Sequence, residues 1–262
     1  MSYDGMTYKN VNGGVRIKDE EAVLDNLTMN TMGGTVGLKG SYNSVNPNQP
    51  KLDFGFNLKD IDIQELASNF ITIEKLAPIA KFAQGKITSN FNMSSLLQPS
   101  LEPIYSSLNG AGDLFTSSIK ISGFKPLEKI GETLKMDNLA TQTIKDLKTY
   151  FKFADGKVSL TPFTTNLGKI GSTISGYSSF DQDINYDILM SVPKSELPKS
   201  MLAAAEQGIA KLNSLAPKLN VQALPDFIPV TVKVLGKVTD PKITTDFKEA
   251  IMKASGSVKD NL

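Results

Sequence analysis

Apolar residues recur at every second position in several stretches of the chain, and each such stretch predicts a strand with one apolar face. The clearest stretches are residues 36–38, 52–58 and 184–192. Turn-prone segments rich in Gly, Asn, Asp and Pro separate them. Because no strand–helix–strand unit recurs, the pattern favours a mainly antiparallel sheet over a parallel one.

In three segments the apolar period changes to three and four residues, which predicts helices. These helical insertions span about 60–83, 125–150 and 199–216. Within the second, one helix is expected over 125–134. A further helix is expected to start at Asp137 or Asn138, with an apolar stripe formed by Ala140, Ile144, Leu147 and Phe151. The segment from Thr239 to Lys242 is expected to be a turn before a short terminal helix over about 246–254.

The chain repeats itself. The repeat covers about 15–58 and 151–193. Within it Leu24, Leu27, Asn30 and Gly40 match Leu160, Phe163, Asn166 and Gly176 without a gap, at one offset of 136 residues (160 − 24 and 176 − 40). An internal repeat of this kind predicts two copies of one β-meander. The expected fold is therefore mainly β (α+β), a single module over 1–262. It is an extended, curved antiparallel sheet of repeated β-meanders, part of which forms an apolar groove, with a few short helices packed on it.

Composition excludes several function classes. The 262 residues carry a formal net charge of +1, and Arg16 is the one arginine among 28 basic residues, so nothing favours nucleic-acid binding. The chain lacks His and Cys, which removes Ser-His-Asp catalysis, thiolate chemistry and the usual zinc sites. We therefore expect no cofactor and no metal.

Three short motifs invite a chemical interpretation, and each has a simpler one. Residues 181–192 resemble a calcium-binding loop, but Tyr186 and Val192 stand where that loop needs Gly and Glu. Gly110-Ala-Gly112 lacks the third glycine of a phosphate-binding loop. Asp60 and Asp62 are spaced as an acid–base pair, yet they precede a predicted helix, where capping is the simpler role. No catalytic residue is predicted, and the protein is not expected to be an enzyme.

Alternating apolar strands outnumber the segments available to cover them. They either line a closed core or leave part of the sheet uncovered as a trough, and an uncovered apolar area above roughly 400 Å² usually marks a binding surface. The sequence leaves both alternatives open.

Several segments, taken in order, resemble the C-terminal region of AsmA-like proteins, relatives of TamB in the envelope of Gram-negative bacteria. The segments are Gly85-Lys-Ile-Thr-Ser, Leu108-Asn-Gly-Ala-Gly-Asp-Leu, Phe153-Ala-Asp-Gly-Lys-Val, Asp187-Ile-Leu-Met-Ser-Val-Pro and Pro229-Val-Thr-Val-Lys-Val-Leu-Gly followed by Asp240-Pro-Lys. The closing segment is the most specific of them. Lys237 departs from the pattern, since family members often have a small hydroxyl residue after that glycine.

The resemblance implies a non-enzymatic envelope protein that contributes to outer-membrane lipid homeostasis. Such a protein is held in the inner membrane by an N-terminal helix and extends into the periplasm, so this chain is expected to be a fragment of a longer one. The implied partner is phospholipid or another acyl lipid, bound or conducted along an apolar β-sheet groove. The candidate groove residues are Phe54, Phe56, Phe91, Met93, Ile184, Tyr186, Ile188, Met190, Val192 and Val232.

Two alternatives stay open. The module could be a structural or assembly unit of the cell envelope that docks partner proteins through a sheet edge. It could also be a hydrolase acting through paired carboxylates.

Overall fold

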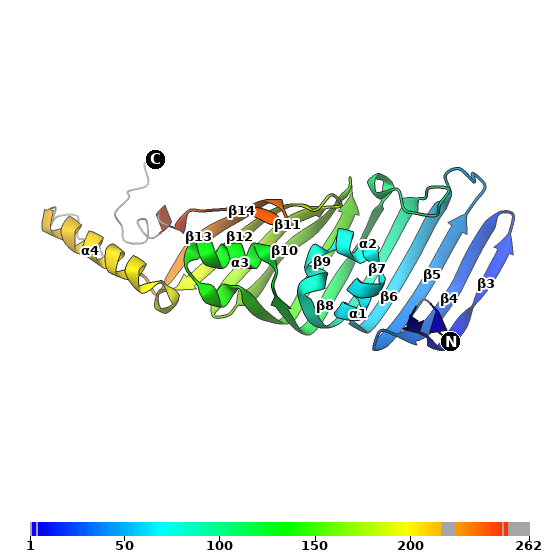
Figure 1. Ribbon diagram of the computed structural model, residues 1–262, viewed down its shortest axis with the longest axis horizontal. Coiled ribbons are helices and arrows are strands. Elements are labelled where there is room, and N and C mark those ends of the chain that lie inside the picture. The colour runs from blue at the N-terminus through cyan, green and yellow to red at the C-terminus, as the bar shows by residue number, and fades with distance from the viewer. Residues whose placement is uncertain (1, 4, 216–223, 248, 251–262) are drawn as a thin grey trace.

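The computed structural model describes residues 2–3, 5–215, 224–247 and 249–250. In this part of the chain twelve strands form one antiparallel sheet in sequence order, from β3 at one edge to β14 at the other (Figure 1). The strands are β3 (Lys9–Lys18), β4 (Glu21–Thr31), β5 (Gly34–Asn43), β6 (Lys51–Asp62), β7 (Ala83–Leu96), β8 (Asn109–Ser122), β9 (Thr141–Ala154), β10 (Lys157–Leu167), β11 (Ile170–Ser179), β12 (Asp183–Pro193), β13 (Phe227–Lys237) and β14 (Asp240–Thr245).

The helices are short, apart from the last. They are α1 (Ile63–Asn69), α2 (Ile71–Leu76), α3 (Lys125–Leu134), α4 (Lys199–Leu215) and the 3-10 turns η1 (Pro78–Phe82), η2 (Tyr105–Ser107), η3 (Asp137–Leu139) and η4 (Lys194–Glu196). Strands β1 (Ser2–Tyr3) and β2 (Met6–Thr7) pair with each other as a separate hairpin. The prediction of a mainly β fold, with an extended antiparallel sheet and a few short helices, is confirmed.

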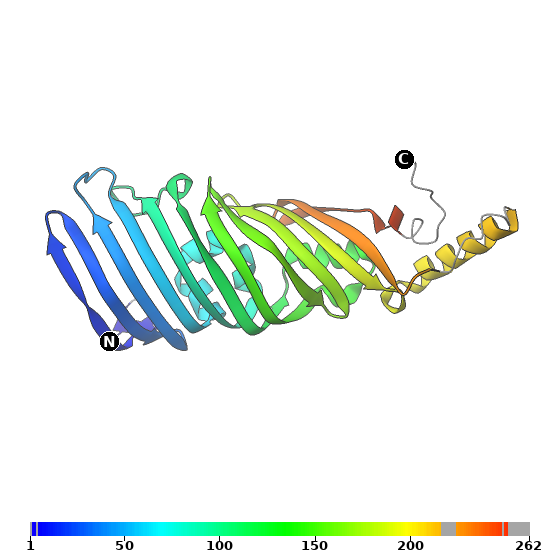
Figure 2. The same cartoon turned by 180° about the vertical axis from the view of Figure 1, so that it is seen from behind.

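The sheet has two unlike faces. Helices α1, α2 and α3 lie on one side of it in Figure 1, and from behind, in Figure 2, the strands are unobstructed. Along β6, Leu58 and Ile61 are buried on the helix side, whereas Asn57 and Lys59 are exposed on the other. We call these the helix face and the polar face. Burial of apolar residues under the helices is the main stabilising term of the fold.

Asp62 begins α1 as its N-cap. Its Oδ1 accepts hydrogen bonds from the backbone N–H groups of Gln64 at 2.9 Å and Glu65 at 3.0 Å. Asp60, two residues earlier, has a left-handed backbone (φ 55°), between the paired positions Leu58 and Ile61 where the register of β6 shifts. Asp62 therefore caps a helix and Asp60 lies at the register shift of β6, so the structure gives each of them a role in the fold.

The prediction of a helix over about 137–150 is wrong. Only the turn η3 forms there, and Thr141–Ala154 is strand β9. Buried residues of β9 have even numbers at its start, as at Ile144, and odd numbers further on, as at Thr149 and Phe153. The alternation of buried and exposed residues therefore shifts by one residue within the strand. Asp146, with φ 49°, lies where the alternation changes phase. This shift produces spacings of three and four residues between Ile144, Leu147 and Phe151, which imitate a helical stripe.

Strand β14 was also not predicted, since its first residues read as a turn. It pairs with β13 from Asp240↔Lys237 to Thr245↔Val232 and forms the second edge of the sheet. The helix predicted over about 246–254 lies largely outside the described residues.

The two segments matched by the sequence repeat pair in the same register. Leu24 pairs with Gly40 and Leu27 with Leu38, and at 136 residues further on Leu160 pairs with Gly176 and Phe163 with Ile174. Both pairs of strands have a register shift at this point. Gly40 (φ 151°) and Gly176 (φ 144°) also share an unusual backbone conformation.

The Thr116 hydroxyl is buried, and its Oγ1 has no hydrogen-bond partner within the described structure. Desolvation of an unpaired hydroxyl is unfavourable, so we expect Thr116→Val to raise the free energy of unfolding by about 1 kcal/mol. Urea unfolding followed by circular dichroism measures this change. Equal or lower stability of the variant would mean that the hydroxyl has a partner in solution.

Candidate apolar binding face

A single row of residues on the helix face crosses the whole sheet, with one residue from every strand. Each member is the direct cross-strand partner of the next. The row runs Val15, Leu24, Gly40, Phe54, Met93, Gly110, Phe153, Val158, Ser178, Ile184, Gly236, Pro241. Since the side chains of one row share a face, this side of the sheet is apolar over nearly its whole width.

All ten predicted groove residues lie on this helix face. Phe54 pairs with Met93 and Phe56 with Phe91 in the N-terminal half. In the C-terminal half Tyr186 and Ile188 belong to the same face of β12, and the pairing of Ile188 with Val232 continues it into β13. The sheet thus places on one surface residues that are about 130 positions apart in the chain (184 − 54).

Five of the ten are closed off from solvent. Ile184 and Ile188 are 4% and 5% exposed, and Met190, Val192 and Val232 are 0% exposed. They form one core cluster with Leu127, Ile130 and Leu134 of α3, which lies in front of β10–β13 in Figure 1. In this structure these five residues are core residues under α3 and do not line an open groove.

Tyr186 lies beside that core and is half-buried. Its hydroxyl shares a hydrogen bond of 2.9 Å with Ser178. Burial raises the pKa of the Tyr186 phenol, and the hydrogen bond from Ser178 opposes that rise. The phenol is therefore neutral at physiological pH, and it contributes no charge to the apolar face.

Three of the four N-terminal candidates, Phe54, Phe56 and Phe91, belong to a cluster of aromatic rings, and Met93 packs beside it. Phe56 stacks on Phe91 with ring centres 4.6 Å apart, and Phe91 lies 6.0 Å from Phe151. Phe56, Phe91 and Met93 are half-buried, and Phe54 is 9% exposed. Phe151 and Phe153 complete the cluster. Sequence reasoning missed both as site residues because it placed Phe151 on a helix, although the alternation of 147, 149, 151 and 153 identifies them.

Beyond this cluster the apolar face continues without a helical cover. Of the described helices, none lies over β3, β4 and β5 (Figure 1). Leu24, Leu27 and Leu38 are half-buried there, while Val15 and Ile17 are 57% and 79% exposed. We call this part, β3–β5 with Phe56, the uncovered apolar face.

The opposite side of the same strands is polar. Arg16 forms a bidentate ion pair with Asp25, with Nε–Oδ2 at 2.7 Å and Nη2–Oδ1 at 3.1 Å. The hydrogen bonds from Arg16 lower the pKa of Asp25, which keeps this carboxylate charged. This exposed ion pair therefore lies on the polar face of β3 and β4, opposite the apolar side chains of the helix face.

The motifs considered for other chemistries have structural positions among the described residues. Among them no three or more His, Cys, Asp or Glu residues converge as metal ligands. Asp183 and Asp187 form ion pairs with Lys237 at 3.0 Å and Lys233 at 3.4 Å. Gly110 and Gly112 lie within strand β8, where their missing Cβ atoms allow close packing against β7. Within the described ranges, no helix combines the length and the hydropathy that crossing a membrane requires.

The fold and this face together define a class: an open antiparallel meander with one apolar and one polar face. Comparisons of the chain with protein-family models, with curated proteins and with solved structures give no match.

Proposed function

We propose that this chain is a non-enzymatic lipid-binding module of the cell envelope, which holds phospholipid acyl chains on the uncovered apolar face. One observation carries the proposal: the apolar row continues from the covered core, through Phe54 and Leu24, to the exposed Val15 at the edge of the sheet. Exposed apolar surface is unfavourable in water, so a continuous stretch of it favours a binding role.

The width of the sheet from β3 to β7 suits the length of an acyl chain. Strands are spaced about 4.8 Å apart, so the four intervals from β3 to β7 measure roughly 19 Å. One leaflet of a bilayer has a hydrocarbon thickness of roughly 15 Å, half of a 30 Å core. A chain lying across the strands would contact Leu24, Leu38 and Phe56 in turn. Binding would be passive, without a covalent step or a cofactor, and each buried methylene would contribute about 0.8 kcal/mol.

The resemblance to AsmA-like proteins supports the cellular setting of the proposal. In that setting the sheet lies in the periplasm, the full-length protein is anchored in the inner membrane, and the bound lipid contributes to outer-membrane lipid homeostasis. The half-buried Met93 beside the aromatic cluster suits acyl chains of varied shape, because the thioether side chain is flexible.

Lipid extraction and native mass spectrometry of the gently purified protein test this proposal. We expect phospholipid to co-purify with the parent chain and to be lost from Leu38→Asp, since a carboxylate on the uncovered face repels acyl chains. The matched control is Thr35→Asp, which places the same charge on the polar face of the same strand and should retain lipid. Absence of phospholipid from both the parent and the control would reject the proposal.

A second candidate function is docking of a partner protein at the β3 edge. All ten residues of β3 are exposed, and its outer backbone groups have no neighbouring strand among the described residues. Such an edge can pair with a strand of another chain. A lipid-free parent chain that captures a defined envelope protein, and loses it when β3 is blocked by Val15→Pro, would favour this function over lipid binding.

A further inference from the structure

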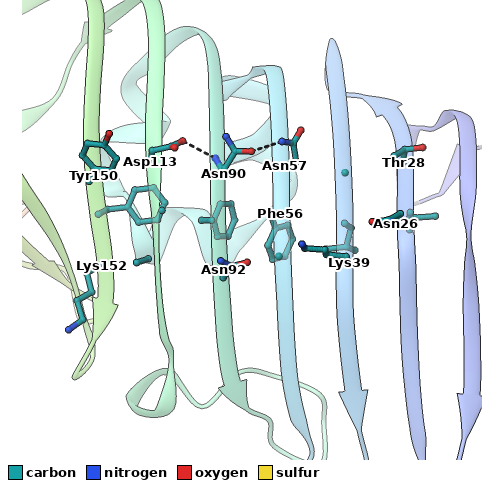
Figure 3. Close-up of a pocket in the computed structure, with 18 of the residues that line it drawn as sticks. Asn26, Thr28, Lys39, Phe56, Asn57, Asn90, Asn92, Asp113, Tyr150 and Lys152 are labelled. Carbon is teal, nitrogen blue, oxygen red and sulfur yellow. Dashed lines mark hydrogen bonds between the residues drawn. The ribbon is translucent and has the colours of Figure 1, made fainter.

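The polar face carries a depression of about 880 Å³ across β4–β10. Its floor contains the small residues Gly37, Gly55 and Ala111, and polar side chains surround them (Figure 3). This depression lies on the opposite side of the sheet from the apolar row. The lining also includes Leu27, Leu38, Phe56, Phe91 and Phe151, which belong to the row of cross-strand partners that lies between two polar rows. The side chains of the polar rows form a second surface, on the other side of the sheet from the proposed lipid site.

Polar residues cross the depression in a row of direct cross-strand partners. Thr28, Gly37, Asn57, Asn90, Asp113 and Tyr150 follow one another from β4 to β9. The Asn57 amide donates a hydrogen bond to the Oδ1 of Asn90, and the backbone N–H of Asn90 donates one to Asp113 Oδ1 at 3.1 Å (Figure 3). These bonds hold the side chains in line. Among the described residues nothing else binds the Asn90 amide N–H groups or Asp113 Oδ2, so the row presents both donors and acceptors.

A second row adds cationic groups and a further amide. Lys39 and Asn92 reach over Gly55 from the two neighbouring strands: a Cβ at Gly55 would lie 3.2 Å from Lys39 Cε and 2.8 Å from Asn92 Oδ1. Lys152 lies at the far end on β9. In the described part of the chain, neither lysine forms an ion pair. Four strand intervals separate them, roughly 19 Å.

Tyr150 provides an aromatic surface at the same end of the depression. It is 51% exposed, and the Nζ of Lys148 lies 5.7 Å from its ring centre. An exposed ring with one apolar face and a polar hydroxyl can stack on the C–H face of a sugar ring. An aromatic ring beside amide and carboxylate groups suits a sugar, because the ring stacks on the sugar while the polar groups hydrogen-bond to its vicinal hydroxyls.

We propose that this depression binds an extended oligosaccharide bearing acidic groups. The amide and carboxylate row recognises hydroxyls, Tyr150 stacks on one sugar ring, and Lys39 and Lys152 pair with acidic substituents several sugar units apart. An acyl chain does not fit the site because it would leave the polar row without partners. Nucleic acid is disfavoured because the depression contains no arginine and one exposed aromatic ring.

Isothermal titration calorimetry with hexagalacturonate and with neutral cellohexaose tests the proposal on the 262-residue chain. We expect saturable binding of hexagalacturonate and weaker binding of cellohexaose. Tyr150→Ala should weaken the binding of both by roughly three- to tenfold, the effect of one lost aromatic contact. Lys152→Gln should weaken the binding of hexagalacturonate alone, by up to about fivefold.

Two controls separate the site from general charge attraction and from loss of structure. Lys242→Gln removes a lysine from the polar face of β14, and Leu189→Ala shortens an exposed residue on that face of β12. Both should bind as the parent does, and circular dichroism checks that each variant is folded. If Tyr150→Ala fails to fold, Asn92→Ala replaces it. No saturable heat with hexagalacturonate, or an equal loss in Lys242→Gln, would overturn the proposal.

Discussion

Met190→Asp is expected to unfold the protein, with a loss of more than about 4 kcal/mol in the free energy of unfolding. Met190 is 0% exposed, and its cross-strand partners are Ser172 on one side and Val230 on the other. A carboxylate there has no cation within the core cluster formed with Leu134 of α3. It must either remain charged without a partner or take up a proton, and both are unfavourable.

The adjacent residue provides a matched control. Leu189 lies on the polar face of the same strand and is 53% exposed, so Leu189→Asp should change the stability by less than about 0.5 kcal/mol. Urea unfolding monitored by far-UV circular dichroism compares the two variants. If Met190→Asp were as stable as Leu189→Asp, α3 would not cover β12 in solution, and the C-terminal half of the helix face would be an open groove after all.

Gly176→Ala is expected to lower the free energy of unfolding by about 2–4 kcal/mol. The backbone at Gly176 has φ 144°, which residues with a side chain rarely adopt. A Cβ there would lie 2.2 Å from the carbonyl oxygen of Asn185 and 2.7 Å from Cδ1 of Tyr186. The first of these contacts is with the backbone of the neighbouring strand, so the strands themselves would have to move apart.

Gly171, on the same strand, is the control for this prediction. A Cβ at Gly171 would meet Asn166 Oδ1 at 3.9 Å, an ordinary contact, so Gly171→Ala should be neutral or slightly stabilising. Thermal unfolding of both variants gives the comparison. A neutral result for Gly176→Ala would show that β11 and β12 are less closely packed than in this structure.

The sequence predicted the strands well wherever the alternation kept one phase. Residues 184–192 show this case, since a strand with a buried face was expected there and β12 spans Asp183–Pro193. The prediction failed where one residue shifts the alternation of buried and exposed positions, as Asp146 does within β9. Such a shift depends on the local backbone conformation, which the apolar pattern does not record.

The candidate site was only partly accessible to sequence reasoning. Alternation identifies the apolar face of a strand, and all ten predicted residues share one face. It does not reveal what covers that face, because the stripe of Leu127 and Ile130 on α3 shows only that this helix packs on something. The polar depression was not predicted at all. Asn57, Asn90, Asp113 and Tyr150 come from four strands, and only the cross-strand register brings them into line.

The strictly sequential strand order has a consequence for how this protein opens. Every strand of the main sheet pairs only with its neighbours in sequence. Each strand is therefore stabilised mainly by its contacts with these two neighbours, as in a one-dimensional array of repeats. At the β12–β13 end α3 closes a core of fully buried side chains, whereas at the β3 end no described helix contributes. Local unfolding should therefore start by peeling of β3 and β4, with the slowest amide exchange in the helix-covered strands β6–β8 and β11–β13.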